Sequence, residues 1–180
     1  LLVLMAQSCG NRSGNHAGKT VFRYCEYAGI TSLDPAYANN QANIWACNHL
    51  YNGLVRLDDS LHVRPCIASS WDISADGTTY TFHLRTDVRF HHDPLLIEGR
   101  KVVASDVVYS FTRIAGKEST SPGAWIFNNL EKNTDGVPTG LKAIDDSTMS
   151  IRLSRSFPPF LGLLASAYGG IVPHEVTDHY

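Results

Sequence analysis

Two adjacent histidines followed by an aspartate, His91, His92 and Asp93, are the residues most suggestive of metal chemistry in this sequence. Imidazole and carboxylate groups bind transition metals, but a site needs them to converge on one point. Neighbouring side chains of an extended chain point to opposite faces, so His91 and His92 are not expected to share an ion. We therefore expect neither a metal centre nor a cofactor.

Serine, histidine and aspartate are frequent enough for hydrolytic chemistry, but the spacing that such chemistry requires is missing. The sequence contains no G-x-S-x-G elbow, no H-E-x-x-H motif and no glycine-rich phosphate loop. His83 lies on the more polar face of an alternating segment and is interpreted as structural. The sequence predicts a protein that is not an enzyme.

The cysteines are Cys9 near the N-terminus and Cys25, Cys47 and Cys66 farther along the chain. None forms a C-x-x-C pair, which disfavours zinc and dithiol redox motifs. In an exported protein two of the last three could form a disulfide. The alternative for Cys47, which falls in a predicted helix, is a small core residue.

The N-terminal residues resemble the end of an export signal. Residues 1–6 form an apolar run far shorter than a membrane span. The small residues Ala6 and Ser8 precede Cys9, as at a bacterial lipoprotein cleavage site. We expect Cys9 to carry a lipid, and residues 1–18 to comprise a signal remnant, this cysteine and a polar tether.

Composition excludes two further classes. The chain has 180 residues, of which 43% are hydrophobic, and a formal net charge of −2, which is ordinary for a globular protein and argues against disorder. Lysines and arginines are scattered, with Arg100-Lys101 as the one adjacent pair, so no basic stripe is available to neutralise phosphates. A nucleic-acid partner is not expected.

Period-two alternation predicts three hairpins, at residues 54–65, 70–90 and 140–154, with turns at Asp58-Asp59, Asp76-Gly77 and Asp145-Asp146. The second hairpin buries the side chains on one face of its second strand, Tyr80, Phe82 and Leu84. A further strand is predicted within residues 20–27. These hairpins are interpreted as scaffold rather than as the site of chemistry.

Helical spacing predicts three helices. One follows Asn39 or Asn40 as cap and is stopped by Gly53; the second is capped by Ser105 and closed by Gly116. The third is predicted over residues 157–168, behind two prolines. Strands and helices gather in clusters instead of alternating strictly, which indicates an α/β fold of the mixed α+β kind.

Taken in order, these segments resemble one family, the bacterial extracellular solute-binding proteins of family 5, which include the dipeptide- and oligopeptide-binding proteins of ABC importers. The resemblance is carried by SLDPA (32–36), HLYNGLVRLD (49–58), PCIASSW (65–71), DGTTYTFHLR (76–85), VRFH (88–91), VVASDVVYSFTRI (102–114), SPGAW (121–125) and LKAIDD (141–146). The stretch HHDPLLIEGRKV (91–102) departs from the family by its greater length.

The resemblance implies a type II periplasmic-binding-protein fold, in which two lobes close over an extended peptide. Family members are much longer than this chain, so we expect only the N-terminal part of lobe I. Residues 19–51 would begin that lobe, residues 52–173 would form a family-specific subdomain, and residues 174–180 would return to the lobe.

The resemblance also implies a function. The protein would act as a monomer that captures di- and oligopeptides in the periplasm or cell envelope, anchored to a membrane by its lipid, and delivers them to ABC permease subunits. Alternatives are a nickel chelate or an oligosaccharide as ligand of the same fold, or a surface lipoprotein with no role in transport.

The same resemblance implies ligand contacts in two segments. The first follows SLDPA and comprises Asn39, Asn40 and Gln41, whose backbone would pair with the peptide. The second follows the Ser-Pro of SPGAW, where peptide binders have an aromatic residue; here Gly123 takes this position and Trp125 lies two residues on. Helix capping is the alternative role for Asn39 and Asn40, and packing is the alternative for Trp125.

Overall fold

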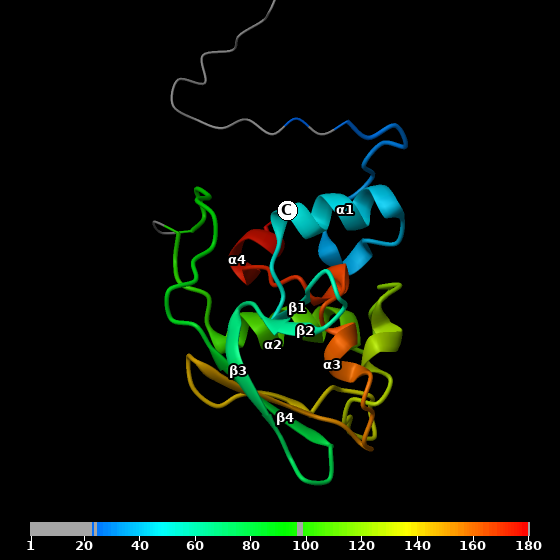
Figure 1. Ribbon diagram of the computed structural model, residues 1–180, viewed down its shortest axis with the longest axis vertical. Coiled ribbons are helices and arrows are strands. Elements are labelled where there is room, and N and C mark those ends of the chain that lie inside the picture. Colours follow the sequence, from blue (N-terminus) through cyan, green and yellow to red (C-terminus); the bar gives the residue numbers. More distant parts are fainter. Residues whose placement is uncertain (1–22, 24, 97–98, 180) are drawn as a thin grey trace, which may run out of the picture.

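The computed structural model describes Arg23 and residues 25–96 and 99–179 (Figure 1). It contains a four-stranded antiparallel sheet with the strand order β3-β4-β6-β5 and a separate two-stranded hairpin, β1-β2. Helices cover the sheet and extend beyond it at one end (Figure 1). The predicted mixed α/β fold is confirmed.

All three predicted hairpins are present. They are β1 (Val55–Leu57) with β2 (Val63–Pro65), β3 (Ala68–Ile73) with β4 (Thr79–Leu84), and β5 (Leu141–Ala143) with β6 (Thr148–Arg152). At the turn between β3 and β4, Gly77 has a φ of +67°, a left-handed conformation that glycine adopts without strain. The Asp-Gly pair therefore sets the register of the longest hairpin.

The core lies on one face of the sheet. Tyr80, Phe82 and Leu84 of β4 are all buried there, as their alternation predicts. On β6, Ile151 lies opposite Tyr80 and Met149 lies opposite Phe82, and both are fully buried. One contiguous apolar cluster thus joins the sheet to the helices that cover it.

The helices are α1 (Gln41–Leu50), α2 (Ala104–Ala115), α3 (Phe160–Leu163) and α4 (His174–Thr177), with short 3-10 helices η1 (Pro35–Tyr37), η2 (Ala124–Phe127) and η3 (Ala167–Gly169). Figure 1 places α2 against the sheet, with α1 and α4 at the end of the molecule away from the β3-β4 turn. No helix in the described part of the chain has the length and apolar character needed to cross a bilayer.

Two of the predicted helix boundaries are wrong. Helix α1 ends at Leu50, three residues before Gly53, because Tyr51 already has an extended backbone. Gly53 instead allows a close approach, since a Cβ there would lie 3.0 Å from the Gly169 carbonyl oxygen. Helix α2 begins at Ala104, so Ser105 is not its cap; the carboxylate of Asp106 accepts the Val103 amide at 2.9 Å.

Two predicted elements are also corrected. Residues 157–168 do not form one helix, because α3 spans only four residues and Gly162, a poor helix former, lies within it. Arg23 and Cys25 lie in no strand, since none of the described residues pairs with this segment; Val21, Phe22 and Tyr24 lie outside the described residues.

Replacing Phe82 by alanine is expected to destabilise the protein by about 3–5 kcal/mol, because a fully buried ring leaves a cavity that the sheet cannot close. Ile73 on the adjacent strand is 48% exposed, so Ile73→Ala is the matched control and should cost under about 1 kcal/mol. Urea unfolding of the full-length protein measures both. Equal losses would contradict the assignment of the core face.

Candidate functional site

The two segments expected to contact a ligand are joined by a buried hydroxyl group. The Ser121 hydroxyl donates to the Ala36 carbonyl oxygen at 2.5 Å and accepts the Gly123 amide at 3.1 Å. Ser121 is 6% exposed, so this link is shielded from water. It brings the chain on either side of Ala36 next to the SPGAW loop, 85 residues farther along.

A second contact supports this junction at the surface. The Tyr37 and Thr120 hydroxyls lie 3.3 Å apart, each on the outer side of the buried link. The structure therefore brings together the SLDPA motif and the SPGAW motif. Asn39 lies two residues beyond Tyr37, at the edge of this junction.

The SLDPA motif owes its shape to Asp34. Its carboxylate accepts the Ala36 amide at 2.9 Å and caps η1, whose first residue is Pro35. The same carboxylate receives two hydrogen bonds from the Arg113 guanidinium of α2, at 3.2 and 2.5 Å. Helix α2 thereby fixes the loop that leads into the predicted ligand segment.

All three members of the predicted ligand segment, Asn39, Asn40 and Gln41, are exposed. The side chain of Asn40 caps α1 by accepting the Asn43 amide at 2.9 Å, so the capping alternative holds for this residue. The Asn40 backbone is extended, with φ −129° and ψ 163°. Its side chain is thus committed to the helix, while Asn39 and Gln41 remain accessible.

Asn43 is a polar residue that sequence reasoning missed. It is 1% exposed, and its side-chain oxygen accepts the Thr31 amide at 3.0 Å while its amide group donates to the Thr31 hydroxyl at 3.0 Å. These bonds tie the loop before SLDPA to α1. The helical spacing placed Asn43 on α1, but nothing in the sequence indicated its distant partner.

Gly123 and Trp125 lie on the other side of the junction. Gly123 is buried and Trp125, in η2, is 53% exposed. A Cβ at position 123 would lie 2.5 Å from Cγ of Tyr168, so the backbone of Gly123 is seated on that ring. Sequence reasoning missed Tyr168, which it had placed in the third predicted helix, and no pattern pointed to its contact with Gly123.

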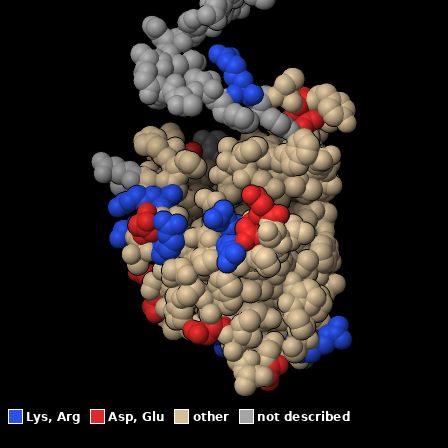
Figure 2. Space-filling view, in the orientation of Figure 1, with Lys and Arg blue, Asp and Glu red and all other residues tan. Residues whose placement is uncertain are grey.

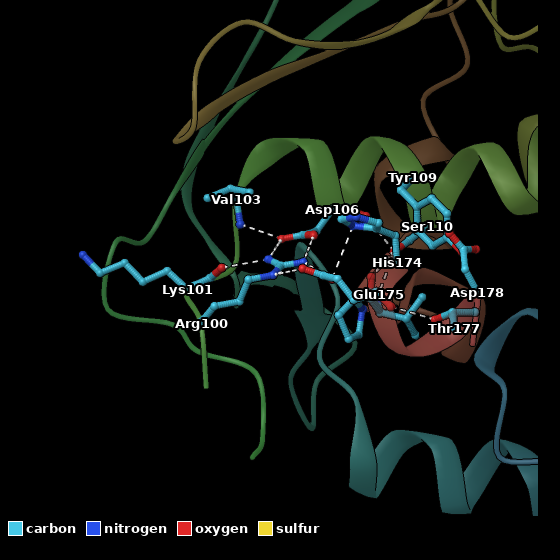
Figure 3. Close-up of polar contacts among 12 residues, drawn as sticks. Arg100, Lys101, Val103, Asp106, Tyr109, Ser110, His174, Glu175, Thr177 and Asp178 are labelled. Atoms are coloured by element: carbon cyan, nitrogen blue, oxygen red, sulfur yellow. Dashed lines mark hydrogen bonds and ion pairs between the residues drawn. The ribbon is translucent and has the colours of Figure 1, made fainter. Parts of the chain in front are cut away.

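Charged contacts surround one end of α2 (Figure 3). The Arg100 guanidinium donates to both carboxylate oxygens of the buried Asp106, at 2.8 and 2.7 Å, and to both oxygens of Glu175 in α4, at 2.5 and 2.6 Å. These hydrogen bonds lower the pKa of Glu175 to about 2. The cluster connects α4 to the start of α2.

A further bond continues this connection along α2. The Tyr109 hydroxyl donates to Asp178 at 2.5 Å, and burial together with this carboxylate raises the pKa of Tyr109 to about 12. The Ser110 hydroxyl accepts the Val172 amide at 3.0 Å. Helix α2 is thus bound at both of these positions to residues 172–178, which follow η3 and include α4.

Two cavities adjoin the segment that carries Val172, Val176 and Thr177. One of about 270 Å³ is lined by apolar residues including Val88, Phe90 and Ile171, with His91, His92 and Asp93 also in its wall. The other, of about 500 Å³, lies beside Asp34, Arg113 and Tyr51. The charged side chains on the face shown in Figure 2 form small mixed groups rather than a patch of one sign.

Among the described residues, metal-ligating atoms come together in one group of three, Asp106, His174 and Glu175, and not at His91-His92-Asp93. Arg100 already donates to both carboxylates of that group, so a cation occupies the position that a metal ion would need. The group is therefore explained as a salt-bridge cluster.

Of the two alternatives for Cys47, a disulfide or a small core residue, the structure shows the core residue. Cys25, Cys47 and Cys66 are all free thiols, so the possible disulfide among them is absent. Cys47 is buried on α1, its thiol lies 3.6 Å from the Leu33 carbonyl oxygen, and burial raises its pKa. Cys9, the predicted lipidation site, lies outside the described residues.

Comparison with known proteins identifies the fold and the family. The sequence profile for bacterial extracellular solute-binding proteins, family 5 middle region, matches residues 62–179. The chain is 34% identical over 135 residues to the dipeptide-binding protein of Escherichia coli, covering 72% of this chain and 25% of that one. It is 29% identical over 178 residues to heme-binding protein A of Haemophilus influenzae, covering 96% and 32%.

The solved structure of Listeria monocytogenes OppA bound to peptide superposes with a TM-score of 0.76 at 28% identity, covering 86% of this chain and 31% of that one. The predicted type II binding-protein architecture is confirmed by this likeness. The chain spans between a quarter and a third of the length of these relatives.

Removing the Ser121 hydroxyl tests the link between the two segments. Ser121→Ala leaves the Ala36 carbonyl and the Gly123 amide without their buried partner, and should destabilise the protein by about 1–3 kcal/mol. Ser60, exposed on a loop, is the matched control for loss of a hydroxyl. Urea unfolding that shows no difference between Ser121→Ala and Ser60→Ala would contradict the role of this link.

The lowered pKa of Glu175 predicts a dependence of stability on pH. Because the folded value of about 2 lies below the ordinary value of 4.5, the stabilising contribution is fully present above pH 4.5 and disappears as the pH falls toward 2. Glu175→Gln should therefore lower the Tm at neutral pH, and its difference from the wild type should shrink below pH 4.5. The exposed Glu118→Gln is the control; an unchanging difference across this range would contradict the assignment.

Proposed function

Because the chain belongs to the bacterial extracellular solute-binding proteins of family 5, we propose that the protein captures extended peptides outside the cytoplasmic membrane and delivers them to an ABC importer. The chain would supply part of one lobe, and a second lobe would close over the peptide. Binding and release of the ligand, without chemical change, would be its activity.

The observation that carries this proposal is the hydrogen bond between Ser121 and Ala36. It supports the view that the segment Asn39–Gln41 and the loop at Gly123 and Trp125 form one surface, although 80 or more residues separate them in sequence. Asn39, Asn40, Gln41 and the indole of Trp125 are exposed, so a ligand can reach them, whereas Gly123 is buried.

The extended backbone that enters α1 suggests how a peptide would be held. Within the segment Asn39–Gln41 the extended residue is Asn40; the Asn39 amide already donates to Tyr37, and the Asn40 carbonyl already accepts the Ile44 amide. A peptide lying beside it would pair with the Asn39 carbonyl and the Asn40 amide, which leaves the peptide side chains free to differ. Any backbone amide that lost water without a partner would cost about 1–3 kcal/mol. Selectivity would therefore rest on peptide length and backbone more than on sequence.

One hydrogen bond supports the proposed division of the chain into lobe and subdomain. It lies where the chain enters and leaves the proposed subdomain, residues 52–173. The Ile171 amide donates to the Asn52 carbonyl at 3.0 Å, so the two crossings into and out of residues 52–173 run side by side. We assign residues 19–51 and 174–180 to the lobe and residues 52–173 to its subdomain. Residues 1–18 would comprise a signal-peptide remnant, Cys9 and the tether, with a lipid on Cys9 holding a monomer in the periplasm or cell envelope.

A thermal-shift experiment on the full-length protein tests the proposed ligand. Mixed tri- to pentapeptides should raise the Tm, because a ligand that binds only the native state at 100 times its Kd stabilises by about 2.7 kcal/mol. Parallel samples contain haem, a nickel chelate or an oligosaccharide. A shift with one of these compounds and none with peptides would overturn the proposal and indicate that other ligand class.

A further inference from the structure

The backbone of Gly123 rests directly on the ring of Tyr168. A Cβ at position 123 would lie 2.5 Å from Cγ and 2.9 Å from Cε1 of that ring, closer than real Cβ atoms come to neighbouring atoms. Cγ cannot move away without a rotation about χ1 or a shift of the backbone. A side chain at position 123 and the present position of the Tyr168 ring therefore exclude each other.

Tyr168 has little freedom to shift its backbone. It lies in η3, where the Gly169 amide donates to Ser166 at 2.9 Å and the Gly170 amide donates to Ala167 at 3.1 Å. A Cβ at Gly170 would lie 3.0 Å from Cβ of Pro35 and 3.1 Å from Cβ of Tyr51. The segment that carries Tyr168 is thus packed tightly between the loop before α1 and the end of α1.

This packing places Tyr168 at the junction of the two proposed ligand segments. Ala167, its neighbour, packs in a small apolar cluster with Ala38 and Cys47. On the other side, Gly123 is hydrogen-bonded through Ser121 to Ala36. The backbone at Ala167 is therefore held beside Ala38, the residue that precedes Asn39, while the ring of Tyr168 lies against Gly123 of the SPGAW loop.

The Tyr168 hydroxyl is available to a ligand. It forms no hydrogen bond with any residue in the described part of the chain, and burial alone raises its pKa. Every buried side-chain nitrogen and oxygen atom in this part of the chain has a hydrogen-bond partner, so this hydroxyl must reach the molecular surface. Tyr168 thus combines a fixed aromatic ring with an unused donor and acceptor.

We propose that Tyr168 is a specificity-determining residue of the ligand site, because its ring fills the space beside Gly123 and its hydroxyl contacts the bound peptide. This inference rests on the proposed function. The ring sets the depth of one subsite, so it limits the size of the peptide side chain accepted there. The ring at position 168 occupies the space that a side chain at position 123 would need, so the two positions together determine the shape of this subsite.

Calorimetric titration of the full-length protein tests the ligand role. The probes are an all-alanine peptide, of the length that gives the largest thermal shift, and its variants with phenylalanine at one position. Tyr168→Phe should weaken binding of the alanine peptide about three- to tenfold at unchanged Tm, as expected for one lost hydrogen bond. Tyr168→Ala should improve the binding of a phenylalanine variant relative to the all-alanine peptide, and it should do so at one peptide position only. The matched control is Tyr27→Ala, which removes a fully exposed tyrosine.

A swap of the two residues tests the shared space without a ligand. Gly123→Tyr should lower the Tm, since two rings cannot occupy one position, and Gly123→Tyr combined with Tyr168→Ala should recover most of that loss. Additive effects on the Tm would overturn the pairing.

The outcomes separate this inference from the proposed function. A wild-type protein that binds none of the peptides overturns both. A wild-type protein that binds them, with Tyr168→Phe equally tight and Tyr168→Ala changed equally at every peptide position, overturns the role of Tyr168 alone.

Discussion

The arrangement of the candidate site depends on one buried hydroxyl group. Ser121 accepts the amide of its own loop and donates to the Ala36 carbonyl, and no water is needed to satisfy either bond. A buried polar group without a partner is costly, so this pairing is strongly favoured over arrangements that separate the loops. The positions of Gly123 on one side, and of the chain that leads to Asn39 on the other, follow from this contact.

Helix α2 connects that local junction firmly to the sheet and to the helices α1 and α4. Its apolar stripe, including Val107, Phe111 and Ile114, is buried toward the sheet. Its polar side carries Asp106, which binds Arg100 and through it Glu175, while Arg113 binds Asp34 at the start of η1. One helix therefore orients both the loop that leads to the proposed ligand segment and the segment that contains α4.

The local features of this fold could be predicted from the sequence, and the long-range ones could not. The alternation of Tyr80, Phe82 and Leu84 predicted the core face because strand geometry alone decides it. A cap at Asn39 or Asn40 was predicted, and Asn40 takes that role, because its bond spans only three residues. Ser105 is not a cap, because α2 begins before it, at Ala104, where the Asp106 carboxylate accepts the Val103 amide. The contacts of Ser121 with Ala36 and of Gly123 with Tyr168 join residues far apart in sequence, and no local pattern encodes them. The expectation for Asn39–Gln41 came from the family resemblance and stays a prediction.

The central claim is that the two loops joined by Ser121 form the surface that holds an extended peptide. A crystal structure of the full-length protein with an alanine peptide tests it most directly. The account predicts that the peptide backbone lies along Asn39–Gln41 with main-chain hydrogen bonds, and that one of its residues contacts Tyr168. A peptide bound elsewhere, for example in the cavity lined by Val88, Phe90 and His91, would contradict it.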